Sequence, residues 1–198
     1  MINCILAGVG GQGTVLASKI IAEAAMTKGW QVRTAETIGM AQRGGCVVSH
    51  VRIGDKINSP LLPLKSADII VGFEPAEAVR CLAYLRENGI VVVNQKGIKP
   101  VTASLSDSDY DGRQMLTYLR NQIKNLVVVN GESICAACGS SRVLNMALLG
   151  AAVSTGALGI SYTELEKAVR KLLPAKLIDL NILALTLGSR INKKENGK

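Results

Sequence analysis

The fold of this chain is decided near its start, by the stretch INCILAGVGGQGT at residues 2–14. An apolar run over residues 2–7 ends at a cluster of glycines, and the apolar residues of 14–28 then recur with helical spacing. A buried strand, a glycine turn and a helix form the first unit of many α/β folds. The stretch therefore predicts a central sheet that contains this strand.

The glycine turn fits the pattern G-x-G-x-x-G and lies between a strand and a helix, as that pattern requires. Glycines allow positive φ and let a phosphate approach the amide N–H groups, while the helix N-terminus adds partial positive charge. The candidate anion-binding residues of this turn are Gly8, Gly10, Gly11, Gln12 and Gly13. The simpler alternative is a tight turn that binds nothing.

An independent NAD(P)- or flavin-binding Rossmann-like protein is the main alternative that the motif raises. Residues 31–35 are predicted to form a second strand, parallel to the first and reached by a right-handed crossover. Glu36 ends that strand, where a carboxylate would bond the ribose of NAD. However, a glycine-arginine loop follows instead of a helix and a third parallel strand. The chain is also short for a cofactor domain plus a substrate domain.

A second glycine-bearing loop is predicted over residues 36–45, which have no hydrophobic period. It contains three further candidate binding residues, Arg43, Gly44 and Gly45. Residues 46–53 then alternate as a strand does. We expect the amides of the first turn and the Arg43 guanidinium to converge on a phosphate or carboxylate. The alternative for Arg43 is a solvated loop charge.

The rest of the chain continues the α/β pattern and ends in helices. Further strands are predicted over residues 68–73, 89–94 and 126–130, and helices from Pro75 and over 114–121, 132–156, 162–173 and 175–191. Ser161 and Glu164 form a capping box, and Pro174 ends that helix. We predict a single, three-layer-like α/β domain over residues 1–192, with a mainly parallel central sheet and a helical C-terminal third. Residues 193–198 are predicted to form a frayed tail.

Composition narrows the class of protein. The chain has 198 residues, 48% of them hydrophobic, and a formal net charge of +8, which favours an acidic partner surface or an anionic ligand. Nucleic-acid binding is not expected, because Lys and Arg are dispersed and aromatic residues make up only 3%. Five cysteines without a secreted spacing, no basic leader region and no unbroken apolar span indicate a cytoplasmic protein with no membrane segment.

The ordered motifs resemble a known family, the γ subunits or γ domains of pyruvate, ketoisovalerate and indolepyruvate ferredoxin oxidoreductases. The motifs that carry the resemblance are GxGGQG at residues 8–13, GMxQRGG at 39–45, VSHVR at 48–52, SPLL at 59–62 and NMxLLG at 145–150. The GMxQRGG form is most similar to the β subunit of indolepyruvate ferredoxin oxidoreductase. The likeness covers residues 1 to about 173, and its specificity lies in the order of the motifs.

The resemblance implies the following activity. A 2-oxoacid, such as indolepyruvate or another arylpyruvate, is decarboxylated on thiamine diphosphate, electrons pass through iron–sulfur clusters to ferredoxin, and the acyl group goes to coenzyme A. In this family thiamine diphosphate, Mg²⁺ and the clusters belong to the partner subunit, so the chain alone would be inactive. It would contribute contacts to coenzyme A or the oxoacid and a subunit interface. Whether the isolated chain forms a homodimer is left open.

Other residues suggest chemistry less strongly, and we assign this chain no catalytic residue and no metal ligand. Cys135 and Cys138 form a C-x-x-C pair at a predicted helix start, where a thiolate would be stabilised, but the default interpretation is two buried small side chains. His50 is the only histidine, and a structural role is favoured over general base. Glu36 and Glu74 both end predicted strands, where ligand-facing residues collect in open α/β sheets, but helix capping or solvent exposure would explain either equally well.

Overall fold

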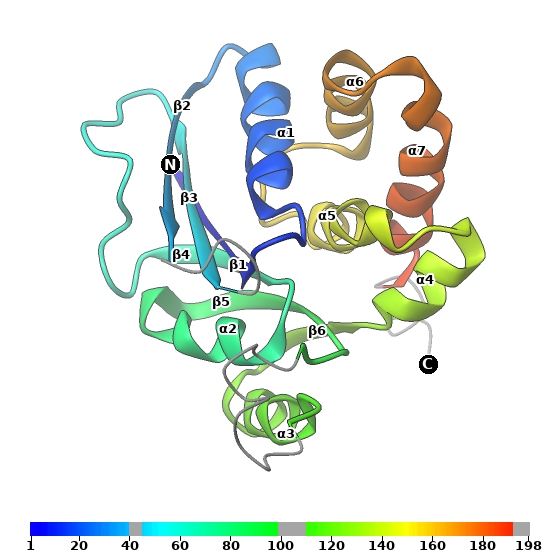
Figure 1. Ribbon diagram of the computed structural model, residues 1–198. Coiled ribbons are helices and arrows are strands. Elements are labelled where there is room, and N and C mark those ends of the chain that lie inside the picture. Colours follow the sequence, from blue (N-terminus) through cyan, green and yellow to red (C-terminus); the bar gives the residue numbers. More distant parts are fainter. Residues whose placement is uncertain (40–44, 99–109, 192–198) are drawn as a thin grey trace.

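The computed structural model describes residues 1–39, 45–98 and 110–191 (Figure 1). Six strands form one sheet: β1 (Ile2–Val9), β2 (Gln31–Ile38), β3 (Cys46–Gly54), β4 (Ala67–Gly72), β5 (Leu85–Asn94) and β6 (Asn125–Val129). The α-helices are α1 (Thr14–Thr27), α2 (Pro75–Arg80), α3 (Arg113–Gln122), α4 (Gly131–Cys138), α5 (Leu144–Ser154), α6 (Tyr162–Leu172) and α7 (Ala175–Ser189). Predicted Arg43, Gly44 and the tail at 193–198 lie outside the described residues.

The sheet has the strand order β2-β3-β1-β4-β5-β6. The pairs β1–β4, β4–β5 and β5–β6 are parallel, whereas β3 is antiparallel to both of its neighbours, β1 and β2. Consequently β2 runs in the same direction as β1, and the mainly parallel sheet is confirmed. The two strands are not neighbours, because β3 pairs with β1 along its whole length and lies between them.

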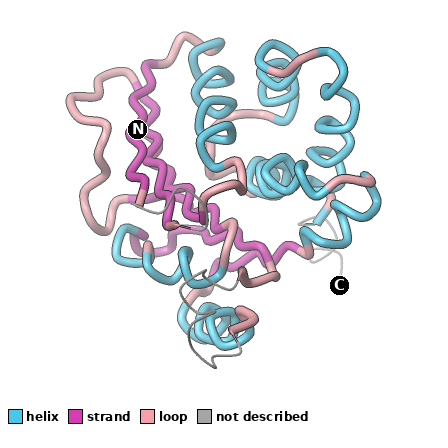
Figure 2. Tube along the Cα trace, in the orientation of Figure 1, coloured by secondary structure: helices cyan, strands magenta, loops and turns pink. Residues whose placement is uncertain are grey.

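Helices cover both faces of the sheet, which makes three layers (Figure 2). In β1, Cys4 and Leu6 point into a core shared with α1, α5, α6 and α7, whereas Ile5 and Ala7 point into a second core with α2 and α3. This alternation follows from the two-residue period of a strand whose faces are both covered. The apolar run 2–7 therefore reads as a continuous buried strand.

Several boundaries differ from the sequence-based expectation, among them the start of β5, which lies at Leu85 and not at residue 89. Residues 36–38 continue β2 instead of starting the loop, because they pair in register with β3. The single helix expected over 132–156 is instead α4, a 3-10 turn (Ser141–Val143) and α5. The break occurs at Gly139, which has φ 69° and caps α4 in the left-handed conformation. The capping box of Ser161 and Glu164 at the start of α6 is confirmed.

Helices α5 and α7 pack with their backbones in direct contact at two glycines. A Cβ on Gly150 would overlap the carbonyl oxygen of Leu185, and a Cβ on Gly188 would overlap that of Ala147. The contact is thus reciprocal, with a glycine of each helix facing the backbone of the other. Because α5 is buried along almost its whole length, the close approach of α7 seals that core.

We predict that Gly188→Ala destabilises the chain by about 1–3 kcal/mol, because the added methyl must push α7 away from α5. Leu183→Ala is the matched control: Leu183 is on the same helix but 44% exposed. Its effect should stay within about 0.5–1 kcal/mol. Urea unfolding of the purified variants measures both, and equal effects would show that the glycine contact does not limit the packing.

Candidate functional site

The carboxyl ends of the parallel strands meet at one edge of the sheet, and the chain leaves this edge in opposite directions. After β1 it enters α1 on one face, and after β4 it enters α2 on the other face. In open α/β sheets such a switch point is where ligands bind. The glycine turn at residues 8–13 follows β1 and Phe73 follows β4, so both lie at this switch point.

Gln12 fastens the glycine turn to the end of β4. Its Oε1 accepts a hydrogen bond from the Val9 N–H at 2.8 Å, and its Nε2 donates one to the Phe73 carbonyl at 2.9 Å. A Cβ on Gly8 would lie 2.7 Å from Gln12 Oε1 and 2.8 Å from Phe73 Cβ, so only glycine fits there. The predicted role of Gln12 as a backbone donor is modified, because its own N–H bonds the Val9 carbonyl at 3.2 Å.

The two predicted glycine-bearing turns do meet. The Gly10 N–H donates to the Gly45 carbonyl at 2.8 Å, next to the register pair of Val9 and Cys46 that begins β3. Within the described residues, this places the end of the second loop directly on the first turn. It also uses the Gly10 N–H, so that amide is not free for an anion in this conformation.

The amides that stay free belong to the start of α1. The N-cap residue Gly13 has φ 81°, and no side chain caps the helix. The N–H groups of Gly11, Gly13, Thr14 and Val15 form no hydrogen bond to a described residue. The first turn of α1 also has no acidic residue. Helix N-termini with free N–H groups attract anions. The predicted anion site is therefore narrowed to the N–H groups at the start of α1.

Asn145 adjoins this point, and the sequence argument gave it no role. It is the second residue of α5 and only 3% exposed, and its Nδ2 would lie 2.7 Å from a Cβ on Gly13. Asn145 opens the NMxLLG motif at 145–150, but that motif did not indicate that Gly13 is its neighbour. The start of α5 is thus brought against the start of α1.

Glu74 organises the same edge, as a helix cap. It is 2% exposed, and its Oε2 accepts from the Glu77 N–H at 3.0 Å at the start of α2. Its Oε1 accepts from the Tyr110 hydroxyl at 2.5 Å and from the Ile98 N–H at 3.4 Å. Burial, reinforced by this bond to Glu74, raises the pKa of Tyr110 well above its usual range. Of the two alternatives given for Glu74, capping is confirmed and exposure is wrong.

Glu36 lies farther from the glycine turn than a dinucleotide-binding carboxylate would. It is on β2, separated from β1 by β3, and its Oε1 accepts from Ser18 Oγ at 3.2 Å. Adjacent strands are about 4.8 Å apart, so the inserted strand roughly doubles the separation expected in a Rossmann half. Its role at a ribose stays a prediction, and the sheet order disfavours the dinucleotide alternative that required it.

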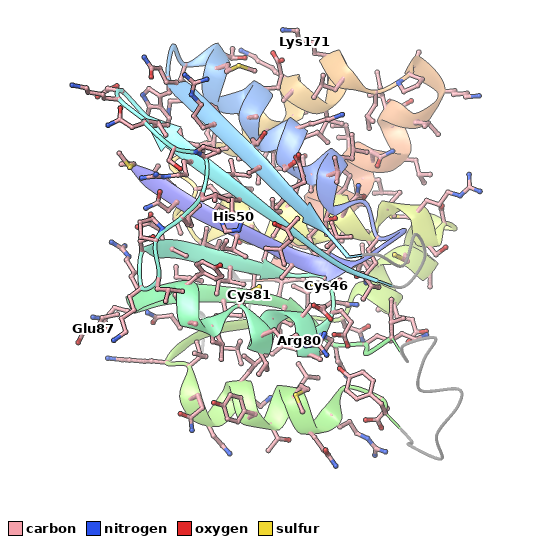
Figure 3. All side chains as sticks on the ribbon, turned by 60° about the vertical axis from the view of Figure 1, so that its left-hand side comes forward. Cys46, His50, Arg80, Cys81, Glu87 and Lys171 are labelled. Carbon is pink, nitrogen blue, oxygen red and sulfur yellow. The ribbon has the colours of Figure 1, made fainter. Side chains whose placement is uncertain are left out.

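The structural interpretation of His50 fits its contacts. The side chain is 4% exposed, its Nδ1 accepts from the Leu62 N–H at 3.2 Å, and its ring meets Tyr84 edge to face at 5.3 Å. The ring points to the face of the sheet covered by α2, as Figure 3 shows. Burial lowers its pKa. His50 therefore holds the connection between β3 and β4 as a neutral acceptor.

The cysteines carry no activated thiolate. Figure 3 shows Cys46, Cys81 and Arg80 near one another. Burial, reinforced by the nearby Glu77 carboxylate, raises the pKa of Cys46 to about 11 and that of Cys81 to about 12. Burial also raises the pKa values of Cys135 and Cys138. The expected position of this pair at a helix start is wrong, because α4 begins at Gly131 and Cys138 is its last residue. The helix C-terminus disfavours a thiolate.

The described residues contain neither a cluster of metal-binding side chains nor a membrane-spanning helix. Among residues 1–39, 45–98 and 110–191, no three His, Cys, Asp or Glu side chains are grouped so that they could hold a metal ion. In the same segments, no helix combines the length and apolar character needed to cross a bilayer.

Comparison with known proteins gives consistent results. The sequence matches the family described as pyruvate ferredoxin/flavodoxin oxidoreductase over residues 3–191. It is 38% identical over 188 residues to the indolepyruvate oxidoreductase subunit IorB of Archaeoglobus fulgidus, covering 94% of this chain and 93% of that protein. It is 30% identical to the pyruvate/ketoisovalerate oxidoreductases common subunit gamma of Pyrococcus furiosus, covering 93% of each. The fold matches the keto/oxoacid ferredoxin oxidoreductase gamma subunit of Geobacter sulfurreducens with a TM-score of 0.72 at 24% identity, over 98% of this chain and 99% of that one.

We predict that His50 makes stability depend on pH. Its pKa is lowered in the folded chain, so its contribution is complete above the unfolded value of about 6.5 and is lost as pH falls below it. Protonation of Nδ1 would also break the bond from Leu62. In urea unfolding between pH 7 and 5, the wild-type chain should lose more stability than His50→Asn, whose side-chain oxygen replaces the acceptor without titrating. Parallel pH curves would contradict this assignment.

Proposed function

The chain belongs to the pyruvate ferredoxin/flavodoxin oxidoreductase family, and we propose on that premise that its glycine turn binds an anionic group of a substrate within the complex. The chain is a γ-type subunit of a 2-oxoacid:ferredoxin oxidoreductase.

The proposed reaction is the oxidative decarboxylation of an arylpyruvate, with indolepyruvate the first candidate. One oxoacid anion and one coenzyme A give one acyl-CoA, one carbon dioxide and one proton, and the two electrons released reduce two ferredoxins. The relatives named as indolepyruvate oxidoreductase subunits support this choice of oxoacid. Thiamine diphosphate, when bound to the complex, supplies the stabilised carbanion that decarboxylation requires.

The partner subunit is the proposed location of thiamine diphosphate, Mg²⁺ and the iron–sulfur clusters. The described residues of this chain do not fit these groups, because they bring together no set of carboxylates or thiols that could hold a metal ion. Buried thiols with raised pKa values are also poor cluster ligands. We therefore assign this chain no electron-transfer or decarboxylation step.

The contribution of this chain is to bind and orient an anion, most simply a phosphate of coenzyme A. The observation that carries the proposal is the free N-terminus of α1, whose turn Gln12 locks to the end of β4. A locked loop does not have to reorganise when the anion arrives, and fixed N–H dipoles bind without changing their protonation state. The proposed contacts are the amides of Gly11, Gly13 and the first turn of α1, with Gly8, Gly10, Gln12 and Gly45 shaping the turn. Arg43 and Gly44 complete the proposed site from the second loop.

The subunit assignment predicts that activity requires assembly. The purified chain should not reduce methyl viologen with any oxoacid plus coenzyme A. The complex co-expressed with its partner subunit should do so, fastest with an arylpyruvate. Comparing indolepyruvate, phenylpyruvate, pyruvate and 2-oxoisovalerate at saturating coenzyme A identifies the substrate. Preference for pyruvate would overturn the arylpyruvate proposal, and binding of NAD or a flavin by the lone chain would favour the dinucleotide alternative.

The anion site is tested by a matched pair at Gly11. Gly11 has φ 99°, and nothing lies within 4 Å of an added Cβ, so Asn and Asp both fit and carry similar backbone strain. In the assembled complex, Gly11→Asp should raise the dissociation constant for coenzyme A about tenfold or more above that of Gly11→Asn, because only Asp adds a negative charge. Isothermal titration calorimetry measures both constants. Equal affinities would remove the turn from the coenzyme A site.

A further inference from the structure

Asn145 has a hydrogen-bond donor that the fold leaves unused. Its Oδ1 accepts from the Met146 N–H at 2.9 Å, which fixes the orientation of the amide and turns Nδ2 toward Gly13. Nδ2 donates to no described residue, although the side chain is only 3% exposed. Among the described residues, Nδ2 is not one of the fully buried polar atoms that lack a partner, so it keeps some contact with solvent. A largely buried amide whose donor stays open at the start of α1 is placed to donate to a group from outside this chain.

Two helix N-termini converge at this place. The start of α1 at Gly13 and the start of α5 at Leu144–Asn145 lie against each other, as Figure 1 shows for the lower end of α1 and α5. Neither helix has an acidic residue in its first turn. The positive ends of both helix dipoles thus act on the same point without a compensating carboxylate from either first turn.

We propose that Asn145 is an anion-binding residue, whose Nδ2 joins the free amides of α1 in holding a phosphate group of coenzyme A. This inference deepens the function proposed above and rests on it. A phosphate suits the site better than a carboxylate, because it offers three acceptor oxygens to donors that come from two helices. Hydrogen bonds from neutral donors to an ionised group are also among the stronger ones.

The competing explanation is that Asn145 only packs against Gly13 and caps α5. The two explanations differ for Asn145→Asp, which keeps the shape and the acceptor for Met146. A carboxylate at this buried position costs desolvation energy that the helix dipole offsets only in part, so the stability of Asn145→Asp does not separate the two explanations. A purely structural Asn145 predicts unchanged coenzyme A affinity in every variant that assembles. An anion-binding Asn145 predicts that the new charge repels the phosphate.

The test uses the assembled complex and measures coenzyme A binding by calorimetry, together with KM and kcat. Asn145→Ala should raise the dissociation constant about tenfold and Asn145→Asp about a hundredfold, as expected for losing a charge-assisted bond and then adding repulsion. The KM for coenzyme A should rise in step, while kcat at saturating coenzyme A stays near the wild-type value. Asn125→Asp is the control, because Asn125 bonds the Asn88 carbonyl at the opposite edge of the sheet. It should leave all three quantities unchanged.

The phosphate involved is identified with dephospho-coenzyme A, which lacks the 3′-phosphate, and with inorganic pyrophosphate as a competitor. If the variants weaken coenzyme A and dephospho-coenzyme A equally, Asn145 holds the diphosphate; if only coenzyme A weakens, it holds the 3′-phosphate. Wild-type affinity in both Asn145 variants overturns the inference. In that case, an effect at Gly11 alone leaves the proposed function standing, and no effect at Gly11 overturns both. Should Asn145→Asp fail to assemble, Asn145→Ala and Asn145→Ser decide by the same measure.

Discussion

The arrangement of the site depends on the Gln12 side chain, which joins the turn after β1 to the end of β4. Both polar atoms of the amide are used, one on the Val9 N–H and one on the Phe73 carbonyl. Each such bond contributes only about 1 kcal/mol to stability. Their geometric effect is larger, because they fix the turn at the point where α1 and α2 depart to opposite faces. The free amides of α1 then keep a constant position relative to the sheet edge.

Local patterns in the sequence were sufficient to predict most helices and strands. They did not show which strands are neighbours in the sheet. The apolar run at 2–7, the glycine turn and the capping box of Ser161 each determine their structure within a few residues, and all three were predicted correctly. Whether β2 or β3 lies beside β1 depends on contacts between residues far apart in the chain. Both strands are compatible with that place, so the pattern alone could not decide. By contrast, the break at Gly139 had a usable local signal, since glycine commonly ends a helix in the left-handed conformation.

The candidate site was predicted in part for the same reason. The glycine turn can be recognised from its sequence motif, and its contact with Gly45 follows from the pairing of β1 with β3. Asn145 could not be found that way, because it stands more than 130 residues from Gly13 in an apolar stretch that reads as a buried helix. The free amide also depends on the orientation of one side chain. Only the folded chain shows that its acceptor is taken by Met146 while its donor is left over.

The carboxylates at this edge of the sheet are engaged in hydrogen bonds within the fold. Glu74 accepts three hydrogen bonds, and Glu36 accepts one from Ser18. In the function proposed above, this edge offers the substrate a set of neutral N–H donors, whose affinity for an anion does not vary with pH while the anion keeps its charge. On that proposal, the chain holds one end of a large substrate in place while the bond-making chemistry occurs on another subunit.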